Sequence, residues 1–156
     1  MAMTTRELIN DFLSQKRIAM VGVSRNPKDF SRALFRELLK QGYDVAPVNP
    51  LAREVEGRPC FTRVEDIAPA VDGALLMTPP EITDRVVRDC AAAGISRVWM
   101  YRALSAGAIH PAAVAFCQEN GMRMIAGYCP FMFLPNAGFV HGLHGFFMKL
   151  VGSYPK

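Results

Sequence analysis

An apolar strand that runs directly into a glycine turn and a helix constrains this chain more than any other feature. Residues 18–23 are continuously apolar, Gly22 and Ser24 mark a sharp turn, and residues 31–41 carry leucines at helical spacing. Such a unit places backbone N–H groups and a helix N-terminus opposite a phosphate. The turn departs from the Gly-x-Gly-x-x-Gly dinucleotide pattern, because Ser24 and Pro27 stand at its second and third glycine positions.

Segments of strand and helix character alternate along the chain. Continuous apolar runs predict strands at 18–23, 44–48, 60–61, 73–77, 97–101 and 122–126. Amphipathic segments predict helices in the first 16 residues and at 31–41, 64–68, 81–93 and 111–120. Apolar strands joined through helices form parallel sheets covered on both faces. We therefore predict an α/β fold, a Rossmann-like doubly wound parallel sheet in three layers, α/β/α.

The length of 156 residues is enough for one domain with a sizeable core. We expect residues 1–130 to form a ligand-binding domain and residues 131–156 to be an aromatic extension packed on the domain or on a partner subunit. Left exposed, its apolar side chains would make a patch that monomers rarely carry, so we expect a homo-oligomer. His141 and His144 stand three apart, but no third ligand accompanies them, so we predict no metal site.

Charge and cysteine usage narrow the class of protein. The net charge of +4 is mildly basic and suits a small anionic ligand, and no Lys/Arg block indicates nucleic acid. Charged residues in the first 16 positions argue against a signal peptide or membrane span. Four dispersed cysteines, none in a Cys-x-x-Cys pair, indicate reduced thiols in a cytoplasmic protein.

The carboxyl ends of parallel strands assemble the ligand site in such folds. The strand at 44–48 ends in Asn49 and Pro50, where an NAD-binding domain has an acidic residue for the ribose. The missing carboxylate argues against NAD and tolerates a ligand with an extra phosphate, such as NADP or coenzyme A (CoA). Four cations lie on nearby loops and suit such a phosphate, unless they are only solvated surface charges: Arg25, Lys28, Arg32 and Arg53.

Three further positions have two interpretations each. Ser24 has an N–H and a hydroxyl that can point into the loop. Ser31 is a candidate N-cap of the helix, or a phosphate ligand. Thr78, Pro79 and Pro80 form a rigid apolar ledge on which an adenine can lie, or Pro80 simply starts the next helix.

Several motifs in order along the chain point to one family. They are residues 18–24 with Pro27, 42–50, 55–59, 78–80, 94–100, and 121–125 with Cys129 and Pro130. Over about residues 17–130 the chain resembles the small stand-alone CoA-binding proteins, whose domain is similar to the N-terminal domain of the succinyl-CoA synthetase alpha subunit. It departs from this family at Tyr101–Arg102–Ala103, where relatives often carry glycine or a carboxylic residue.

The resemblance implies a role for each part of the site. The first turn with Ser24 would hold phosphate, Asn49 and Pro50 would border the nucleotide, and residues 78–80 would face the adenine. Residues after strand 97–101 and around Cys129 would line the pantetheine side, although Cys129 is also explained as a small cysteine at the edge of the core. The predicted binding residues are Gly22, Val23, Ser24, Arg25, Pro27, Lys28, Ser31, Arg32, Asn49, Pro50, Thr78, Pro79, Pro80, Tyr101 and Cys129.

Binding is better supported than catalysis. None of the three histidines lies at a strand end, and no nucleophile–base arrangement has an interpretable spacing. We therefore expect non-catalytic binding of CoA or an acyl-CoA at the carboxyl ends of the strands. Two alternatives stay open: an NADP-binding oxidoreductase or redox sensor, and an interaction subunit whose nucleotide site is vestigial.

Overall fold

Five parallel strands form one sheet in the computed structural model, which describes residues 2–102 and 107–135. In spatial order they are β2 (Asp44–Val48), β1 (Arg17–Val21), β5 (Gly73–Leu76), β6 (Arg97–Met100) and β7 (Arg123–Ala126). Every neighbouring pair is parallel. This order is one of the two common doubly wound arrangements, so the predicted Rossmann-like α/β fold is confirmed.

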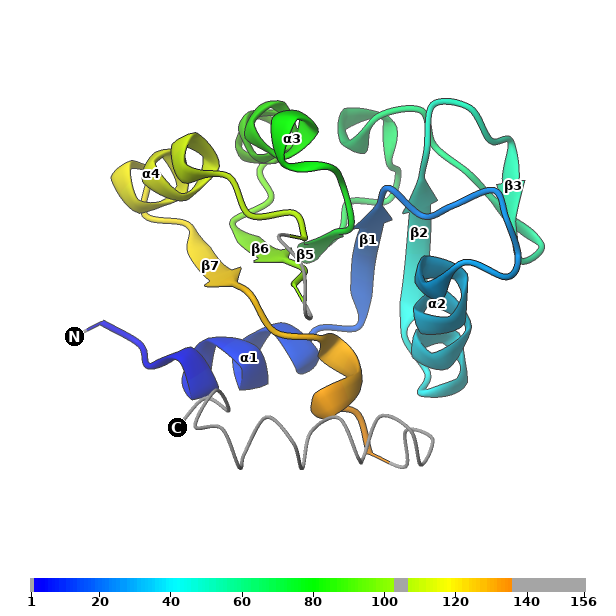
Figure 1. The fold of residues 1–156 in the computed structure, drawn as a ribbon, viewed down its shortest axis with the longest axis horizontal. Coiled ribbons are helices and arrows are strands. Elements are labelled where there is room, and N and C mark those ends of the chain that lie inside the picture. The colour runs from blue at the N-terminus through cyan, green and yellow to red at the C-terminus, as the bar shows by residue number, and fades with distance from the viewer. Residues whose placement is uncertain (1, 103–106, 136–156) are drawn as a thin grey trace.

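Helices cover both faces of the sheet (Figure 1). α1 (Thr5–Leu13) and α2 (Phe30–Lys40) lie on one face, and α3 (Pro80–Ala92) and α4 (Pro111–Glu119) lie on the other. Successive strand side chains point to opposite faces, so the buried apolar residues form two separate clusters, one under each helix pair. The three layers α/β/α are therefore as predicted.

Side-chain caps determine where α1 and α2 begin. Thr4 Oγ1 accepts the Glu7 N–H at 3.2 Å, and Glu7 Oε2 accepts the Thr4 N–H at 2.7 Å, which completes a capping box. α2 begins at Phe30, and its cap is Asp29, whose Oδ1 accepts the Ser31 N–H at 2.9 Å. The prediction that Ser31 caps this helix is wrong, because a carboxylate two residues earlier occupies the cap position.

The predicted strand at 60–61 is also wrong. Phe61 makes only a single parallel bridge, with Val48, at the edge of the sheet. The preceding residues form an antiparallel hairpin of β3 (Glu54–Val55) and β4 (Arg58–Pro59). β4 pairs with β3 and ends in a proline, which has no N–H to donate to β2. Only Phe61, after the hairpin, therefore makes a bridge to β2.

Helix bounds otherwise follow the sequence closely. The helices predicted at 31–41, 81–93 and 111–120 are found within one residue of those bounds. The one predicted at 64–68 is a single 3-10 turn, η1 (Val64–Asp66), because proline at position 69 disfavours helix in the residue before it. Within the described ranges, none of the helices has the length and apolar character needed to cross a bilayer.

The start of the predicted C-terminal extension packs against the domain. η2 (Pro130–Met132) lies on the α1 side of the sheet (Figure 1), and Phe131 and Leu134 are each only 6% exposed. These residues belong to the core cluster beneath α1 and α2. Residues 136–156, including the paired histidines and most of the aromatic positions expected to meet a partner, lie outside the described residues.

The central strand supplies a stability test. Leu75 is 1% exposed in β5, so Leu75→Ala should lower the free energy of unfolding by about 2–5 kcal/mol through lost burial and a cavity. Leu51 is 71% exposed, and Leu51→Ala should change it by less than about 0.5 kcal/mol. Urea unfolding followed by circular dichroism measures both. Equal effects of the two substitutions would contradict this placement of the core.

Candidate functional site

Three strand ends meet at Gly22. Its N–H donates to the Val48 carbonyl at 3.0 Å, which ties the end of β1 to the end of β2. A Cβ at Gly22 would lie 2.9 Å from the Met77 carbonyl oxygen and 3.2 Å from Thr78 Cγ2, just beyond β5. The helices that follow β1 and β5 lie on opposite faces of the sheet. This is the switch point at which doubly wound sheets bind ligands.

Two cavities of about 440 Å³ each flank this point. The first, which we name the α3 cavity, is walled by the ends of β1, β2 and β5, by residues 62–64 and by α3. The second, the loop cavity, is walled by the β1–α2 loop, the ends of β5 and β6, and residues 107–108. Gly22, Thr78 and Pro79 line both cavities, so one elongated ligand that passes Gly22 can enter both.

The β1–α2 loop satisfies much of its own hydrogen bonding. Ser31 Oγ donates to Asp29 Oδ1 at 2.6 Å and accepts the Ser24 N–H at 2.8 Å. Ser24 Oγ in turn accepts the Asn26 N–H at 3.0 Å. The expectation that the Ser24 N–H faces the open loop is therefore wrong, because Ser31 takes it. Ser24 and Ser31 do both line the loop cavity, where the Ser24 hydroxyl can still donate its proton.

Arg32 is engaged within the protein. Its guanidinium donates to Glu56 Oε1 at 3.0 Å and to the carbonyls of Ser24 and Arg25 at 3.3 and 3.2 Å. Arg36 donates to the same Glu56 oxygen at 2.7 Å, and this bond, with that of Arg32, holds the pKa of the Glu56 carboxyl below its usual range. Arg32 therefore ties the loop to the β3–β4 hairpin and lines neither cavity.

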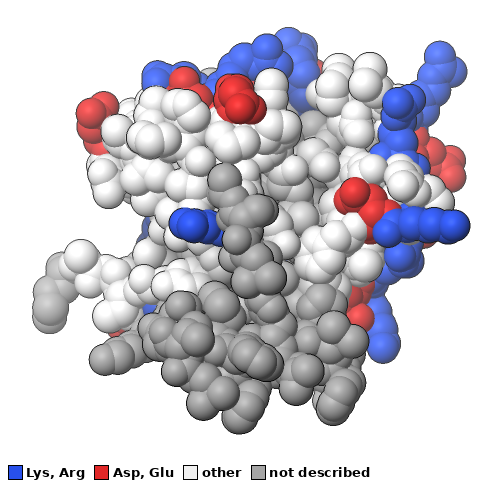
Figure 2. Space-filling view, in the orientation of Figure 1, with Lys and Arg blue, Asp and Glu red and all other residues white. Residues whose placement is uncertain are grey.

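The other predicted cations stand away from the cavities. Arg25, Lys28 and Arg53 are exposed, and neither cavity is lined by any of them or by Pro27. On the face that Figure 2 shows, Lys and Arg side chains gather along the upper and right-hand edges and alternate with Asp and Glu. The four cations expected from the sequence, of which Arg32 lies in α2 and the others on loops, thus line neither cavity.

Asn49 joins two strand ends. Its Nδ2 donates to the Val23 carbonyl at 2.9 Å, and its Oδ1 accepts the Leu51 N–H at 2.8 Å. Asn49 and Pro50 line the α3 cavity, whereas the side chain of Val23 is fully buried and lines neither cavity. The asparagine at the end of β2 therefore holds the β1–α2 loop against the turn that follows β2.

The two prolines after β5 have different roles. Pro79 lines both cavities, whereas Pro80 is the first residue of α3 and lines neither. The Thr78 and Thr83 hydroxyl oxygens lie 2.6 Å apart, and both side chains are buried. This bond fixes the first turn of α3 against the end of β5. The interpretation that Pro80 starts the next helix is therefore confirmed, and binding of an adenine against Thr78 and Pro79 stays a prediction.

Aromatic rings close the far side of the loop cavity. Tyr101 and Phe30 line it, and their ring centroids lie 5.6 Å apart. Burial raises the pKa of the Tyr101 phenol to about 12. Cys129 is 2% exposed within the core cluster beneath α1 and α2, and burial raises the pKa of its thiol to about 11. Cys129 therefore lies in the core and lines neither cavity.

Comparison with known protein families agrees with this geometry. The model of the CoA-binding domain family matches residues 16–135, which include all five strands of the sheet, α2, α3 and α4, and the residues that line both cavities. The chain belongs to the CoA-binding domain family.

Related proteins share this domain in two settings. A crystallised hypothetical protein from Pyrococcus horikoshii superposes with a TM-score of 0.75 at 29% identity, over 83% of this chain and 88% of that one. The alpha subunit of the ADP-forming acetate–CoA ligase II of Pyrococcus furiosus is 29% identical over 92 residues, which are 58% of this chain and 20% of that subunit. Against that ligase subunit, the CoA-binding domain thus spans about a fifth of the relative's length.

A solved structure of a larger protein gives the same result. The dinucleotide-forming acetyl-coenzyme A synthetase 1 of Candidatus Korarchaeum cryptofilum, in complex with phosphate and ADP, superposes with a TM-score of 0.64 at 27% identity. The match covers 74% of this chain and 26% of that one. The CoA-binding domain is therefore shared by small chains and by chains several times longer.

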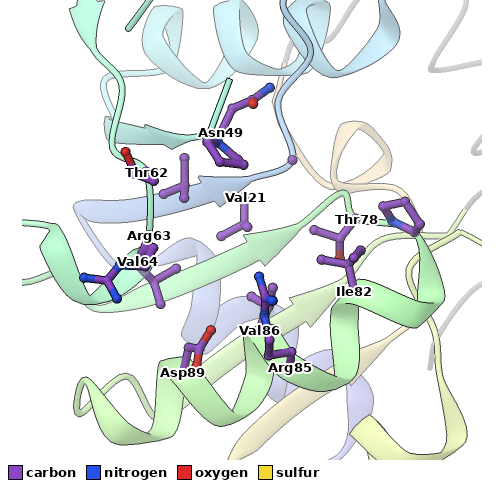
Figure 3. Close-up of a pocket in the computed structure, with 14 residues that line it drawn as sticks. Val21, Asn49, Thr62, Arg63, Val64, Thr78, Ile82, Arg85, Val86 and Asp89 are labelled. Carbon is purple, nitrogen blue, oxygen red and sulfur yellow. The ribbon is translucent and has the colours of Figure 1, made fainter. Parts of the chain in front are cut away.

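The sequence analysis did not predict one wall of the α3 cavity in this CoA-binding domain. α3 presents Ile82, Arg85, Val86 and Asp89 to the α3 cavity. Figure 3 shows Arg85 and Asp89 rising from α3 on the side opposite Asn49 and Thr62. Their spacing of three, four and seven residues places them on one helix face, so helical periodicity combined with the predicted switch point was a usable signal.

Gly22 supplies a test of the switch point. Gly22→Ala should lower the free energy of unfolding by about 2–5 kcal/mol, because the φ of +88° costs a side chain about 1–2 kcal/mol and the Cβ also meets Met77. Gly42→Ala is the matched control, since Gly42 has a φ of +94° and nothing within 4 Å of its Cβ position. Gly42→Ala should lower the free energy of unfolding only by the backbone strain of the positive φ, about 1–2 kcal/mol. Equal losses in urea unfolding would show that the close approach at Gly22 is unimportant.

Proposed function

We propose that the chain binds CoA or an acyl-CoA across the two cavities and catalyses no reaction of its own. The observation that carries this proposal is that the α3 and loop cavities share a wall at Gly22, a position without a side chain, and at Thr78 and Pro79. CoA is an elongated molecule with a flat base at one end, a pyrophosphate in the middle and a flexible pantetheine arm. Membership of the CoA-binding domain family supports this ligand class.

The α3 cavity suits the adenine. Valine side chains from four different segments line it: Val21, Val48, Val64 and Val86. Pro79 and Ile82 add further apolar surface, and Ile82 is 42% exposed. Ligand pockets are mostly apolar, with a few polar groups that fix orientation. An adenine placed here would cover an apolar surface that otherwise faces water.

The pyrophosphate fits beside Gly22. No side chain obstructs a close approach of the backbone there, the Ser24 hydroxyl can donate a hydrogen bond, and α2 begins directly after the loop. The Asp29 carboxylate also lines the loop cavity, but its Oδ1 already accepts two bonds from Ser31. The pantetheine arm would then run toward Phe30 and Tyr101.

The side chains of the site favour binding over chemistry. Cys129 lies in the core, and the pKa of its thiol, raised by burial to about 11, keeps it protonated at neutral pH. His110 Nδ1 accepts the Ala112 N–H at 3.1 Å and so caps α4. Across residues 2–102 and 107–135, no three His, Cys, Asp or Glu side chains gather as metal ligands. The hydroxyl–carboxylate pair in the loop cavity, Ser31 Oγ donating to Asp29 Oδ1 at 2.6 Å, has a structural use, because the same two side chains accept the Ser24 and Ser31 N–H groups and so close the β1–α2 loop.

Calorimetric titration tests the proposal. We expect wild-type protein to bind CoA at micromolar or lower concentration and to bind NADP, NAD and ATP more weakly. Ser24→Glu should reduce CoA affinity at least about 10-fold, because a carboxylate would stand where the pyrophosphate passes. Ser96→Glu makes the same change of charge at an exposed position that lines neither cavity, and it should leave affinity unchanged.

The same titration has outcomes that overturn the proposal. No heat with CoA together with tight binding of NADP would favour the alternative, an NADP-dependent oxidoreductase or redox sensor. Equal losses of CoA affinity in Ser24→Glu and Ser96→Glu would place the pyrophosphate elsewhere. Cleavage or transfer of the thioester by purified protein, followed by mass spectrometry, would end the non-catalytic assignment.

Thiol reactivity gives an independent check of the absence of a cysteine nucleophile. Burial raises the pKa of Cys90 to about 12 and those of Cys117 and Cys129 to about 11, and it also raises the pKa of Cys60. Because only the thiolate reacts, native Cys129 should alkylate with iodoacetamide at pH 7.5 at least about 100-fold more slowly than in the unfolded chain. Intact mass spectrometry with and without guanidinium measures this. Rapid labelling of one native thiol that CoA blocks would contradict the prediction.

A further inference from the structure

The face of α3 that lines the α3 cavity carries an arginine that is paired with none of the described residues. Arg85 lines the α3 cavity, and no hydrogen bond or ion pair joins its side chain to any described residue. Arg88, three residues later on the same helix, donates to Asp84 at 3.2 Å and stacks on the Phe116 ring at 4.6 Å. The guanidinium of Arg85 therefore keeps its five donors for a ligand.

The second arginine of this cavity is already engaged. Arg63 donates to Asp66 at 3.3 Å. That bond, with smaller contributions from Glu65 and Asp89, raises the pKa of Arg63. Asp89 lines the cavity one helical turn beyond Arg85 and makes the Arg63 side unfavourable for an anion. An anionic group in the α3 cavity is therefore drawn to the Arg85 end.

The cations expected from the sequence do not supply this charge. Arg32 is bound to Glu56, and Arg25, Lys28 and Arg53 line neither cavity. The end of β2 carries Asn49 in place of a carboxylate, so a phosphate on the ribose meets no repulsion from that side. Arg85 stands across the cavity from Asn49 (Figure 3).

We propose that Arg85 binds the phosphomonoester on the adenosine ribose, the 3′-phosphate of CoA, and so makes the site specific for phosphorylated adenosine. The proposal rests on the binding function proposed above. Arginine binds phosphate through parallel, charge-assisted hydrogen bonds, which explains why this unpaired guanidinium faces the cavity that suits the adenine. Arg85 is a specificity residue, and the apolar wall still holds the base without it.

A comparison of CoA with 3′-dephospho-CoA isolates this contact. Wild-type protein should bind CoA about 10- to 100-fold more tightly than 3′-dephospho-CoA. Arg85→Gln should bring this ratio close to one while leaving the affinity for 3′-dephospho-CoA unchanged. Arg88→Gln, on the same helix but paired outside the cavity, and Arg25→Gln, on the loop, should each keep the wild-type ratio. Thermal unfolding of each variant verifies that the fold is intact.

The outcomes separate this inference from the function on which it rests. Suppose that wild-type protein binds CoA and 3′-dephospho-CoA. If Arg85→Gln then leaves the ratio of the two affinities unchanged, or if Arg25→Gln lowers that ratio as much, the role of Arg85 is overturned but the binding function stands. Binding of neither ligand by wild-type protein would overturn the function. If the protein does not bind CoA but prefers NADP to NAD, and Arg85→Gln abolishes that preference, then Arg85 binds a 2′-phosphate and CoA is not the ligand.

Discussion

The close approach of three strand ends at Gly22 is the constraint on which the rest of the site depends. Its N–H holds the end of β2 through the Val48 carbonyl, and the Met77 carbonyl stands where a Cβ would be. A larger residue would push β1 away from the end of β5 and would add a side chain where the walls of the two cavities meet. Because the helices after β1 and β5 lie on opposite faces, this stretch of backbone without a side chain is also the switch point of the sheet, the place where we propose that the ligand binds.

Ion pairs within the protein decide which charged side chains remain available to bind a ligand. Arg32 and Arg36 converge on Glu56, and the Asp29–Ser31–Ser24 chain of hydrogen bonds keeps the turn closed on itself. These contacts stiffen the β1–α2 loop. They also engage the Arg32 guanidinium and the Ser24 N–H, which the sequence suggests are available to bind a phosphate. The cavity-wall guanidinium that has no hydrogen bond or ion pair to any described residue is that of Arg85 in α3, on the other side of the switch point. Two charged residues of the α3 cavity, Arg85 and Asp89, thus come from a helix face, whereas the cations predicted on the β1–α2 loop line neither cavity.

Most of the secondary structure could be predicted from the sequence, because parallel strands buried on both faces are continuous apolar runs. The failures have local physical causes. The strand expected at residues 60–61 is reduced to one bridge, because the hairpin before it pairs with itself. Serine is a favourable N-cap, which is why the sequence predicts Ser31 as the cap, but α2 already includes Ser31, and Asp29, directly before the first helical residue, accepts the Ser31 N–H.

The sequence by itself determined the architecture and the edge of the sheet at which we propose the site, since apolar periodicity defines the strands and parallel strands bring their carboxyl ends to one edge. Residues such as Gly22, Asn49, Thr78 and Pro79 could be assigned to that edge without coordinates. Only the tertiary structure decided which charges pair, because Arg32 and Glu56 lie 24 positions apart in the chain and meet only once the hairpin folds back. It also decided which face of α3 turns inward, and with it the placing of Arg85, because helical spacing defines a face but the packing of the helix on the sheet orients it.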